Sequence, residues 1–179
     1  ELLTEYGDIF EVWFDGANGG DGYYGGAYGN RNIDRETYYG WPTTVQLVRN
    51  LQPNCIIWNE VGPDVRWCGN EQGAGGSTNW CRYSYSKHVP GAPGNTTLSQ
   101  GEIDGTDFVA SEVNVSIRPG WFYHEFEDLK VKSLKKLFNI YLNSVGSGST
   151  WLLNFPITPS GRIHSADAEA AISLNKYLA

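Results

Sequence analysis

The chain has 179 residues, 40% of them hydrophobic, which is enough for one compact domain with a sizeable core. Its formal net charge of −7 argues against nucleic acid or an anionic membrane as a partner, because both require clustered Lys and Arg. No apolar run reaches the ~18 residues of a membrane span, and no signal peptide is predicted at the start.

Aromatic residues and glycine are both abundant: aromatics make up 14% of the chain, and 22 residues are Gly. This mixture suits surfaces that stack flat rings, and sugars offer flat apolar C–H faces. The alternative is that these aromatics fill the core. Cys55, Cys68 and Cys81 lack metal-binding spacing, so ordinary thiols are predicted, and nothing favours one disulfide pair over another.

The predicted elements begin with the end of a helix at residues 1–7. A short buried strand follows at 8–14, and then a Gly- and Tyr-rich loop over 16–32. Asp34 is predicted to be the N-cap of a helix that ends before Pro53, because apolar residues recur there at helical spacing.

The second part of the chain repeats this alternation. It is predicted to contain a strand at 54–59, a polar Gly-rich stretch at 62–105, a strand at 112–117, a helix at 133–144 and a strand at 150–155. A terminal helix begins at Ser165 or Asp167 and runs to about Tyr177.

This order of strands and helices is typical of a parallel sheet with crossover helices. Four strands with three helices amount to about half of an eight-stranded barrel. An α/β fold with a partial (β/α)8-like (TIM) barrel is therefore predicted. A small doubly wound α/β domain is the alternative.

Asp15 ends the apolar run of the first strand and is followed at once by Gly16. Barrel enzymes carry their catalytic residues at the carboxyl ends of strands, so Asp15 is a catalytic candidate on position alone. The alternative is a turn-forming or helix-capping Asp before a Gly-rich loop.

A second acidic candidate, Glu71, lies beyond the next predicted strand. Two carboxylates at neighbouring strand ends could flank one bound glycosidic bond, which is what glycoside hydrolysis requires. Trp67 and Arg66 nearby could shift the ionisation of such a group in opposite directions. Asp64 and Glu60 are equally plausible acids by this argument, and Glu71 could instead be one acid of a solvated loop.

A third cluster follows the strand at 112–117. It contains the cation Arg118, a turn at Pro119-Gly120, three consecutive aromatics from Trp121, and a His. Trp121 could present its ring as a platform for the apolar side of a sugar. The alternative is that these aromatics cap the end of the barrel.

Several of these segments resemble glycoside hydrolase family 29, the α-L-fucosidases. The matching residues are 12–16, 51–53, 62–67, 69–71, 115–124, 143–146 and 152–154. The resemblance covers essentially the whole chain, and it is strongest to the subgroup that removes fucose linked α-1,3 or α-1,4 in Lewis-type glycans.

The resemblance implies a retaining double displacement without a metal or organic cofactor. It gives the nucleophile role to Asp15 and the acid/base role to Glu71, and so decides against Asp64 and Glu60 for that role. A retaining pair of carboxyl groups should lie about 5 to 5.5 Å apart. The residues expected to bind substrate are Trp13, Asp64, Arg66, Arg118 and Trp121.

Two other functions remain open at this stage. The chain could hold fucosylated glycans without cleaving them, as a carbohydrate-binding or inactive remnant. It could also belong to another retaining barrel glycosidase, such as a galactosidase.

The resemblance begins in the middle of the family's catalytic barrel. Residues 1–179 are therefore expected to be the C-terminal portion of that domain, roughly the second half of the barrel. The expected partners are a fucosylated oligosaccharide or glycoconjugate and the rest of the catalytic domain, covalently joined or on a second chain. Because fucosylated glycans are mostly outside the cytosol, a secreted, periplasmic or lysosomal location is expected.

Overall fold

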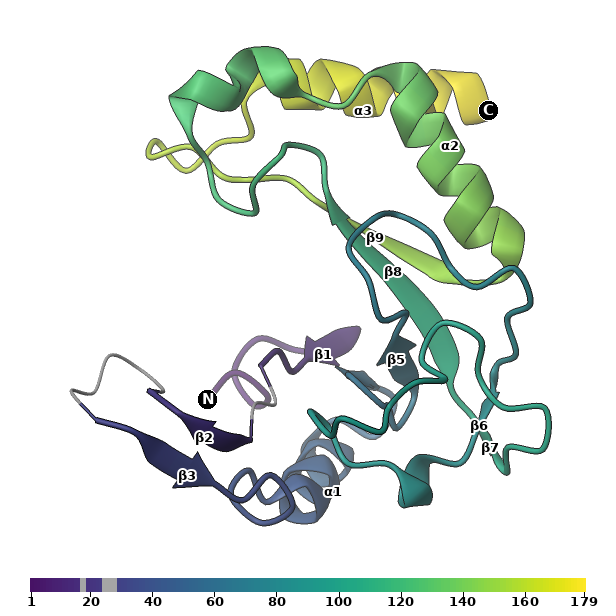
Figure 1. The fold of residues 1–179 in the computed structure, drawn as a ribbon. Coiled ribbons are helices and arrows are strands. Elements are labelled where there is room, and N and C mark those ends of the chain that lie inside the picture. Colours follow the sequence, from purple (N-terminus) through teal and green to yellow (C-terminus); the bar gives the residue numbers. More distant parts are fainter. Residues whose placement is uncertain (17–18, 24–28) are drawn as a thin grey trace. The chain divides into compact units, whose positions relative to one another are not determined.

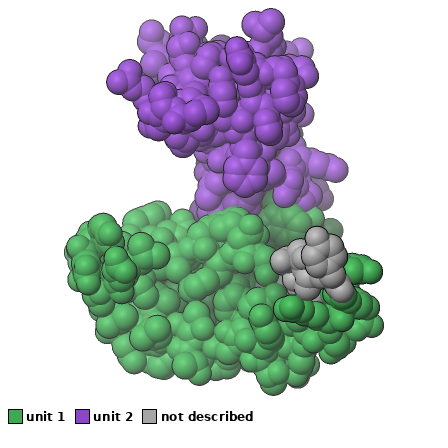
Figure 2. Space-filling model, turned by 90° about the vertical axis from the view of Figure 1, so that its left-hand side faces the viewer, with its two compact units in different colours: residues 1–69, 80–111 green, residues 70–79, 112–179 purple. Residues whose placement is uncertain are grey.

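The computed structural model describes residues 1–16, 19–23 and 29–179. The chain divides into two compact units, which Figure 2 shows in different colours. Unit 1 comprises residues 1–69 and 80–111, and unit 2 comprises residues 70–79 and 112–179. Each unit has hydrophobic clusters of its own.

Unit 1 contains three short parallel strands (Figure 1). They are β1 (Glu11–Trp13), β4 (Ile56–Asn59) and β5 (Val65–Trp67), with β4 between the other two. The helix α1 (Trp41–Leu51) connects β1 to β4 in the sequence. The predicted strands at 8–14 and 54–59 are confirmed, in shorter form.

The two faces of this sheet carry different side chains. Val12 and Ile57 are aligned in neighbouring strands and pack with Val48 of α1. Trp13 and Trp58, aligned one residue further on, belong to the opposite face because side chains alternate along a strand. One face of the sheet therefore packs against the helix, and the other is aromatic.

The helix α1 begins later than its sequence predicts. Asp34 caps a turn instead, since its carboxylate accepts hydrogen bonds from the Thr37 hydroxyl (2.7 Å) and the Glu36 amide (3.1 Å). Gly40 then adopts a left-handed conformation (φ 57°), which no helix can continue through, and Trp41 starts the helix. The prediction of Asp34 as the helix N-cap was wrong because a local turn competes for the same side chain.

Two segments predicted as loops contain strands. In the first loop, β2 (Gly20–Gly22) pairs antiparallel with β3 (Arg31–Ile33). The stretch 62–105 holds β5 and also β6 (Arg82–Tyr83), which pairs antiparallel with β7 (Asp107–Phe108), and the short helix η1 (Tyr85–Lys87). These strands have two or three residues each, too few to show a periodic pattern.

In unit 2, the strands β8 (Ala110–Ser116) and β9 (Thr150–Asn154) pair in parallel, from Glu112 with Thr150 to Ser116 with Asn154. Two long helices cover this pair, and Ile117, Leu137 and Leu174 form its core. The helices of unit 2 are α2 (Leu134–Ser144), α3 (Ser165–Leu178), η2 (Glu125–Lys130) and η3 (Val145–Ser147). The predicted strands at 112–117 and 150–155 and the helix at 133–144 are confirmed.

The terminal helix is also confirmed, and it begins at Ser165, one of the two predicted first residues. The ring of His164 accepts a hydrogen bond from the Ala166 amide (3.3 Å), so His164 is the N-cap. Asp167 lies in the first turn and is completely buried. It is unavailable as a cap because it pairs with Arg118.

Within each unit, the parallel strands lie side by side in their order along the chain, β1-β4-β5 in unit 1 and β8-β9 in unit 2. A doubly wound sheet reverses its strand order at a switch point, whereas a barrel adds each strand beside the last. The strand order therefore supports the barrel prediction over the doubly wound alternative.

Two further predictions concern cysteines and membrane spans. Cys55, Cys68 and Cys81 are free thiols. Among the helices in the described ranges, none has the length and apolar character needed to cross a membrane.

Candidate active site

Asp15 lies immediately beyond the carboxyl end of β1, as its sequence predicts. The amide of Phe14 still donates to the carbonyl of Trp58 on β4 (3.1 Å), and Gly16 leaves the strand with a φ of 78°. Asp15 is therefore the last residue before the turn, and its side chain is exposed. A carboxylate in this position is accessible to a ligand at the strand ends.

An aromatic stack lies beside Asp15 in the sequence and on the same strand end. The rings of Trp13 and Trp58 are stacked, with centroids 3.8 Å apart and an interplanar angle of 15°. Trp13 is 38% exposed, whereas Trp58 is 4% exposed, so Trp58 supports the ring that solvent reaches. A supported, exposed indole is the kind of surface on which the apolar face of a sugar stacks. Sequence reasoning missed Trp58, although its place in the buried strand at 54–59 was a signal.

Glu71 belongs to a loop, residues 70–79, that is part of unit 2. Asn70 shapes the start of this loop: its side-chain oxygen accepts from the Gln72 amide (3.0 Å), and its side-chain nitrogen donates to the Ala74 carbonyl (2.9 Å). These two bonds span the backbone of Glu71. The loop therefore presents the exposed Glu71 side chain from a defined turn.

Contacts with α2 and the residues after it hold the rest of the loop. Gly73 has a φ of 85°, and a Cβ atom there would lie 2.7 Å from the Ile140 side chain, so only glycine fits. The Gly75 amide donates to the Asn143 carbonyl (2.8 Å). Further along, Asn79 donates to the Ser149 hydroxyl (2.8 Å).

The structure brings Glu71 and Trp121 together, although they are 50 positions apart in the sequence. The indole Nε1–H of Trp121 donates a hydrogen bond to Oε2 of Glu71, with a distance of 3.1 Å. Both residues were predicted from sequence as site residues, but their contact was not. They belong to the same unit and to one hydrogen-bonded arrangement.

Trp121 is presented by a tight turn over residues 116–121, here called the Trp121 turn. Ser116 and Asn154 face each other at the carboxyl ends of β8 and β9. The Ser116 hydroxyl donates to the Gly120 carbonyl (2.7 Å), and the Asn154 amide donates to the Trp121 carbonyl (2.9 Å) and to Ser116 Oγ (3.0 Å). Two strand ends thus determine where the indole lies.

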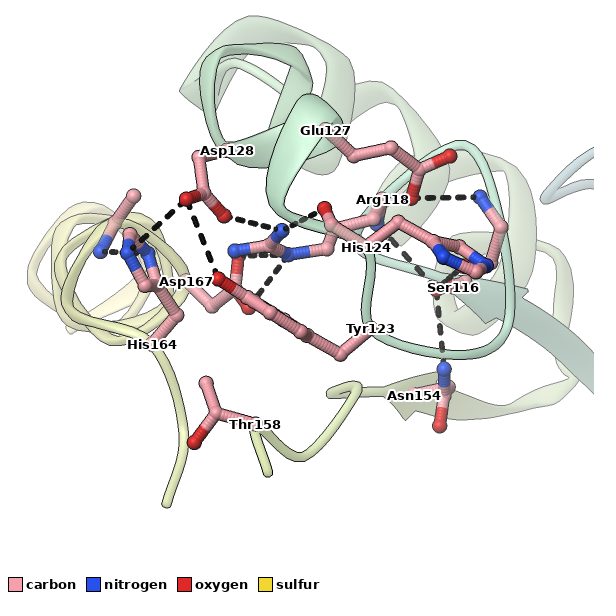
Figure 3. A network of polar contacts seen from close by, with 12 residues as sticks. Ser116, Arg118, Tyr123, His124, Glu127, Asp128, Asn154, Thr158, His164 and Asp167 are labelled. Carbon is pink, nitrogen blue, oxygen red and sulfur yellow. Dashed lines mark hydrogen bonds and ion pairs between the residues drawn. The ribbon is translucent and has the colours of Figure 1, made fainter. Parts of the chain in front are cut away.

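The buried carboxylate of Glu127 holds the same turn from the other side (Figure 3). Its Oε2 accepts from the Gly120 amide at 3.4 Å, and a Cβ atom at Gly120 would lie 3.4 Å from Oε1. This is ordinary van der Waals distance, so the hydrogen bond to the Gly120 amide, and not the lack of a side chain, joins Glu127 to the turn.

Arg118 lies in the same turn but points into the protein (Figure 3). Its guanidinium is completely buried: Nε donates to both carboxylate oxygens of Asp167 (2.9 Å each), and Nη1 donates to Asp128 (2.7 Å). Burial acts against its charge, but the hydrogen bonds to Asp167 and Asp128 raise the pKa of Arg118. It also lies over the Tyr123 ring, 4.8 Å from the centroid. Arg118 thereby joins the turn to η2 and α3.

Arg66 is likewise completely buried. It donates to the backbone carbonyls of Leu98 (2.8 Å) and Trp80 (2.9 Å), and also to that of Val109. Burial lowers the pKa of Arg66. Its contacts join three segments of unit 1.

Asp64 also binds protein groups. It accepts hydrogen bonds from the Arg49 guanidinium (2.6 Å) and from the Ile57 amide (2.7 Å), and so connects α1 to β4. Glu60, the other acid considered, accepts from the amide of Gly91. In the structure, Arg66, Arg118 and Asp64 each form hydrogen bonds with protein groups of their own unit. A contact of these residues with substrate stays a prediction.

No family model matches the chain. Among curated proteins, it is 41% identical to alpha-L-fucosidase 1 of Arabidopsis thaliana over 167 residues, which are 93% of this chain and 30% of the relative. Among solved structures, it matches a glycoside hydrolase 29 family member from an unknown rumen bacterium with 53% identity and a TM-score of 0.88. That match covers 99% of this chain and 32% of the other.

The chain is homologous to the family 29 α-L-fucosidases. Another structure, SpGH29, matches with 34% identity and a TM-score of 0.80 over 96% of this chain and 35% of its own. The chain thus spans about a third of these relatives. The structural match confirms the α/β fold with part of a (β/α)8-like barrel.

Homology to fucosidases fits the presence of two exposed carboxylates at the strand ends and in the adjoining loop. Asp15 belongs to unit 1 and Glu71 to unit 2. Their catalytic roles and the separation expected of a retaining pair stay predictions. The α-1,3/1,4 subgroup is a prediction as well.

Proposed function

We propose that residues 1–179 supply the C-terminal portion of the catalytic domain of a retaining exo-α-L-fucosidase. Its substrates would be glycans with terminal α-1,3- or α-1,4-linked L-fucose. The observation that carries the proposal is homology to family 29 fucosidases along nearly the whole chain, together with exposed carboxylates at both positions that the family motifs mark. The rest of the catalytic domain is the first partner we expect, and a secreted, periplasmic or lysosomal location would suit the substrate.

In the first step, a carboxylate oxygen of Asp15 attacks the anomeric carbon of fucose and forms a glycosyl ester. The bond from that carbon to the leaving oxygen breaks, and Glu71 gives its proton to this oxygen. In the second step, Glu71 takes a proton from water while the water oxygen attacks the same carbon. The ester breaks, Asp15 regains its charge, and fucose leaves with its original anomeric configuration.

The stack of Trp13 on Trp58 supports the proposed function because it offers a binding surface for fucose. Trp13 lies at the end of β1, two residues before the proposed nucleophile. Its indole is partly exposed and stacks on the buried indole of Trp58. Fucose has an apolar C–H face and a methyl group, which an indole can cover.

The test uses the whole polypeptide that carries this chain, with a Lewis-type oligosaccharide and an aryl α-L-fucoside as substrates. Asp15→Asn is expected to abolish fucose release from both, because it removes the nucleophile. Glu71→Gln is expected to reduce release strongly from the oligosaccharide, whose leaving group needs a proton. Unchanged hydrolysis by Asp15→Asn would overturn the proposal.

Two alternatives have their own outcomes in this test. Binding of the fucosylated oligosaccharide without any cleavage would favour a glycan-binding role. Faster release of galactose than of fucose from matched aryl glycosides would favour a galactosidase.

A further inference from the structure

The Trp121 turn holds an indole N–H against one oxygen of Glu71, and this contact suggests a role beyond sugar stacking. Oε2 of Glu71 accepts the Nε1–H of Trp121 at 3.1 Å. No hydrogen bond joins Oε1 to any residue of the described chain. The two oxygens of this carboxyl group therefore lie in different surroundings.

The backbone that carries this indole is held in place by hydrogen bonds. Ser116, Asn154 and Glu127 are three polar side chains that bind the backbone of the Trp121 turn. Ser116 and Glu127 are buried, and Asn154 is partly buried. Side chains fixed by packing and secondary hydrogen bonds keep a donor within the narrow range that directed hydrogen bonding needs.

Glu71 is held from its own side as well. The Asn70 side chain spans its backbone with two hydrogen bonds, and Gly73 packs on Ile140 of α2. Donor and acceptor thus approach from two separately fixed segments of one unit. The contact follows from the fold of unit 2 and does not depend on unit 1.

We propose that Trp121 is a positioning residue that reserves Oε2 of Glu71 as a hydrogen-bond acceptor and leaves Oε1 to carry the catalytic proton. This inference rests on the proposed function. A protonated carboxyl group accepts an N–H better through its carbonyl oxygen than through its hydroxyl oxygen, so the hydrogen bond at Oε2 places the proton of the acid form on Oε1. That proton passes from Oε1 to the leaving oxygen in the first step, and Oε1 takes one from water in the second.

The proposal is specific about which substrates depend on Trp121. A poor leaving group, such as a sugar hydroxyl, needs the proton from a well-placed acid. An activated aryl leaving group departs as an anion without it. A Trp121→Phe variant removes the donor and keeps a smaller aromatic face for the sugar, and the loss of ring area affects both substrates alike. It should therefore lose more activity on the oligosaccharide than on the aryl fucoside.

The kinetic test measures kcat/KM of the whole protein on a Lewis-type oligosaccharide and on 2,4-dinitrophenyl α-L-fucoside. For Trp121→Phe, we expect a loss of about 10- to 100-fold on the first substrate and less than about 3-fold on the second. Trp151→Phe is the matched control, since its indole Nε1–H has no hydrogen-bond partner in the described chain and lies in the same unit. Equal losses on both substrates, or no loss on either, would overturn the proposal.

A second measurement needs no turnover. In protein labelled with ¹⁵N at the indole, the Nε1–H signal of Trp121 is identified by its loss in Trp121→Phe. We expect this signal to move with pH as Glu71 ionises and to stay in place in Glu71→Gln. A signal with the same pH response in both proteins would show that the hydrogen bond is absent, and the proposal would fail.

The two measurements separate the inference from the function on which it rests. A protein that releases no fucose from either substrate overturns the proposed function. The Trp121 signal then decides by itself whether the indole holds Glu71.

Discussion

Unit 1 carries Asp15 on the end of a strand, whereas unit 2 carries Glu71 on a loop, and the two units support their carboxylates differently. Asp15 follows directly from the pairing of β1 with β4 and has an aromatic stack as its neighbour. Glu71 depends on a hydrogen-bonded turn, a glycine packed on α2 and an indole from 50 residues away. A strand end places a side chain through backbone pairing, but a loop needs polar side chains to do the same.

The first prediction breaks the polar support of unit 2 and has the largest expected effect. Arg118→Met leaves the carboxylate of Asp167 buried without its partner, because both side chains are completely buried. We expect a loss of about 3 to 5 kcal/mol in the stability of unit 2. Hydrogen exchange of the amides in β8, β9 and α3 would measure it.

The control for this prediction is the pair in unit 1 formed by Arg49 and Asp64, whose side chains are 32% and 34% exposed. Arg49→Met should cost about 1 kcal/mol or less, because water replaces the lost partner. Equal costs for the two variants would mean that burial does not distinguish the two pairs.

The second prediction concerns the loop that carries Glu71. Gly73→Ala must place a Cβ atom 2.7 Å from Ile140 and adopt a positive φ. We expect a loss of about 1 to 3 kcal/mol and faster hydrogen exchange in residues 70–79. Gly148→Ala shares the positive φ (81°) but meets no atom within 4 Å, so it should cost less. A larger loss in Gly148→Ala would contradict the packing argument.

The third prediction addresses the aromatic side of the comparison. Trp13→Leu removes the stacking on Trp58 but no hydrogen bond in the main-chain pairing of β1. A loss of about 0.5 to 1.5 kcal/mol is expected from the aromatic pair. Amide exchange in β4 should therefore change only modestly. Loss of all protection in β1 and β4 would show that the stack, and not backbone pairing, holds the end of the strand.

The fourth prediction is a pH effect in unit 2. The hydrogen bond from Arg118 lowers the pKa of Asp128, with a further contribution from the charge of His164. A lowered pKa in the folded state means that the stabilisation is present above the unfolded value, about 4. It is lost as the pH falls through the folded value.

Asp128→Asn should therefore destabilise unit 2 at pH 7 and converge with the unchanged protein in strong acid. Urea unfolding at a series of pH values, followed by a probe in unit 2, would measure the difference. A constant difference across all pH values would exclude ionisation of Asp128 as its source.

Local patterns in the sequence determined much of the scaffold. Three elements were predictable from local periodicity: β8 from the alternating run at 112–117, β9 from the apolar run at 150–155, and α2 from the amphipathic segment at 133–144. Each pattern involves only residues that are close in the sequence. The position of Asp15 was predictable for the same reason: an apolar run followed by Asp-Gly marks the end of a strand. Where a pattern had only three residues, as in β5, it gave no signal.

Tertiary structure decided which partners the site residues have. Trp58 supports Trp13 only through the register of β1 with β4, and Trp121 meets Glu71 only because the strand ends and α2 hold two separate segments. Arg118 is buried because carboxylates at positions 128 and 167 surround it. Periodicity and local turns are properties of neighbouring residues, so sequence reveals them. Contacts between residues that are far apart in the sequence depend on how strands and helices pack, and only the folded structure specifies them.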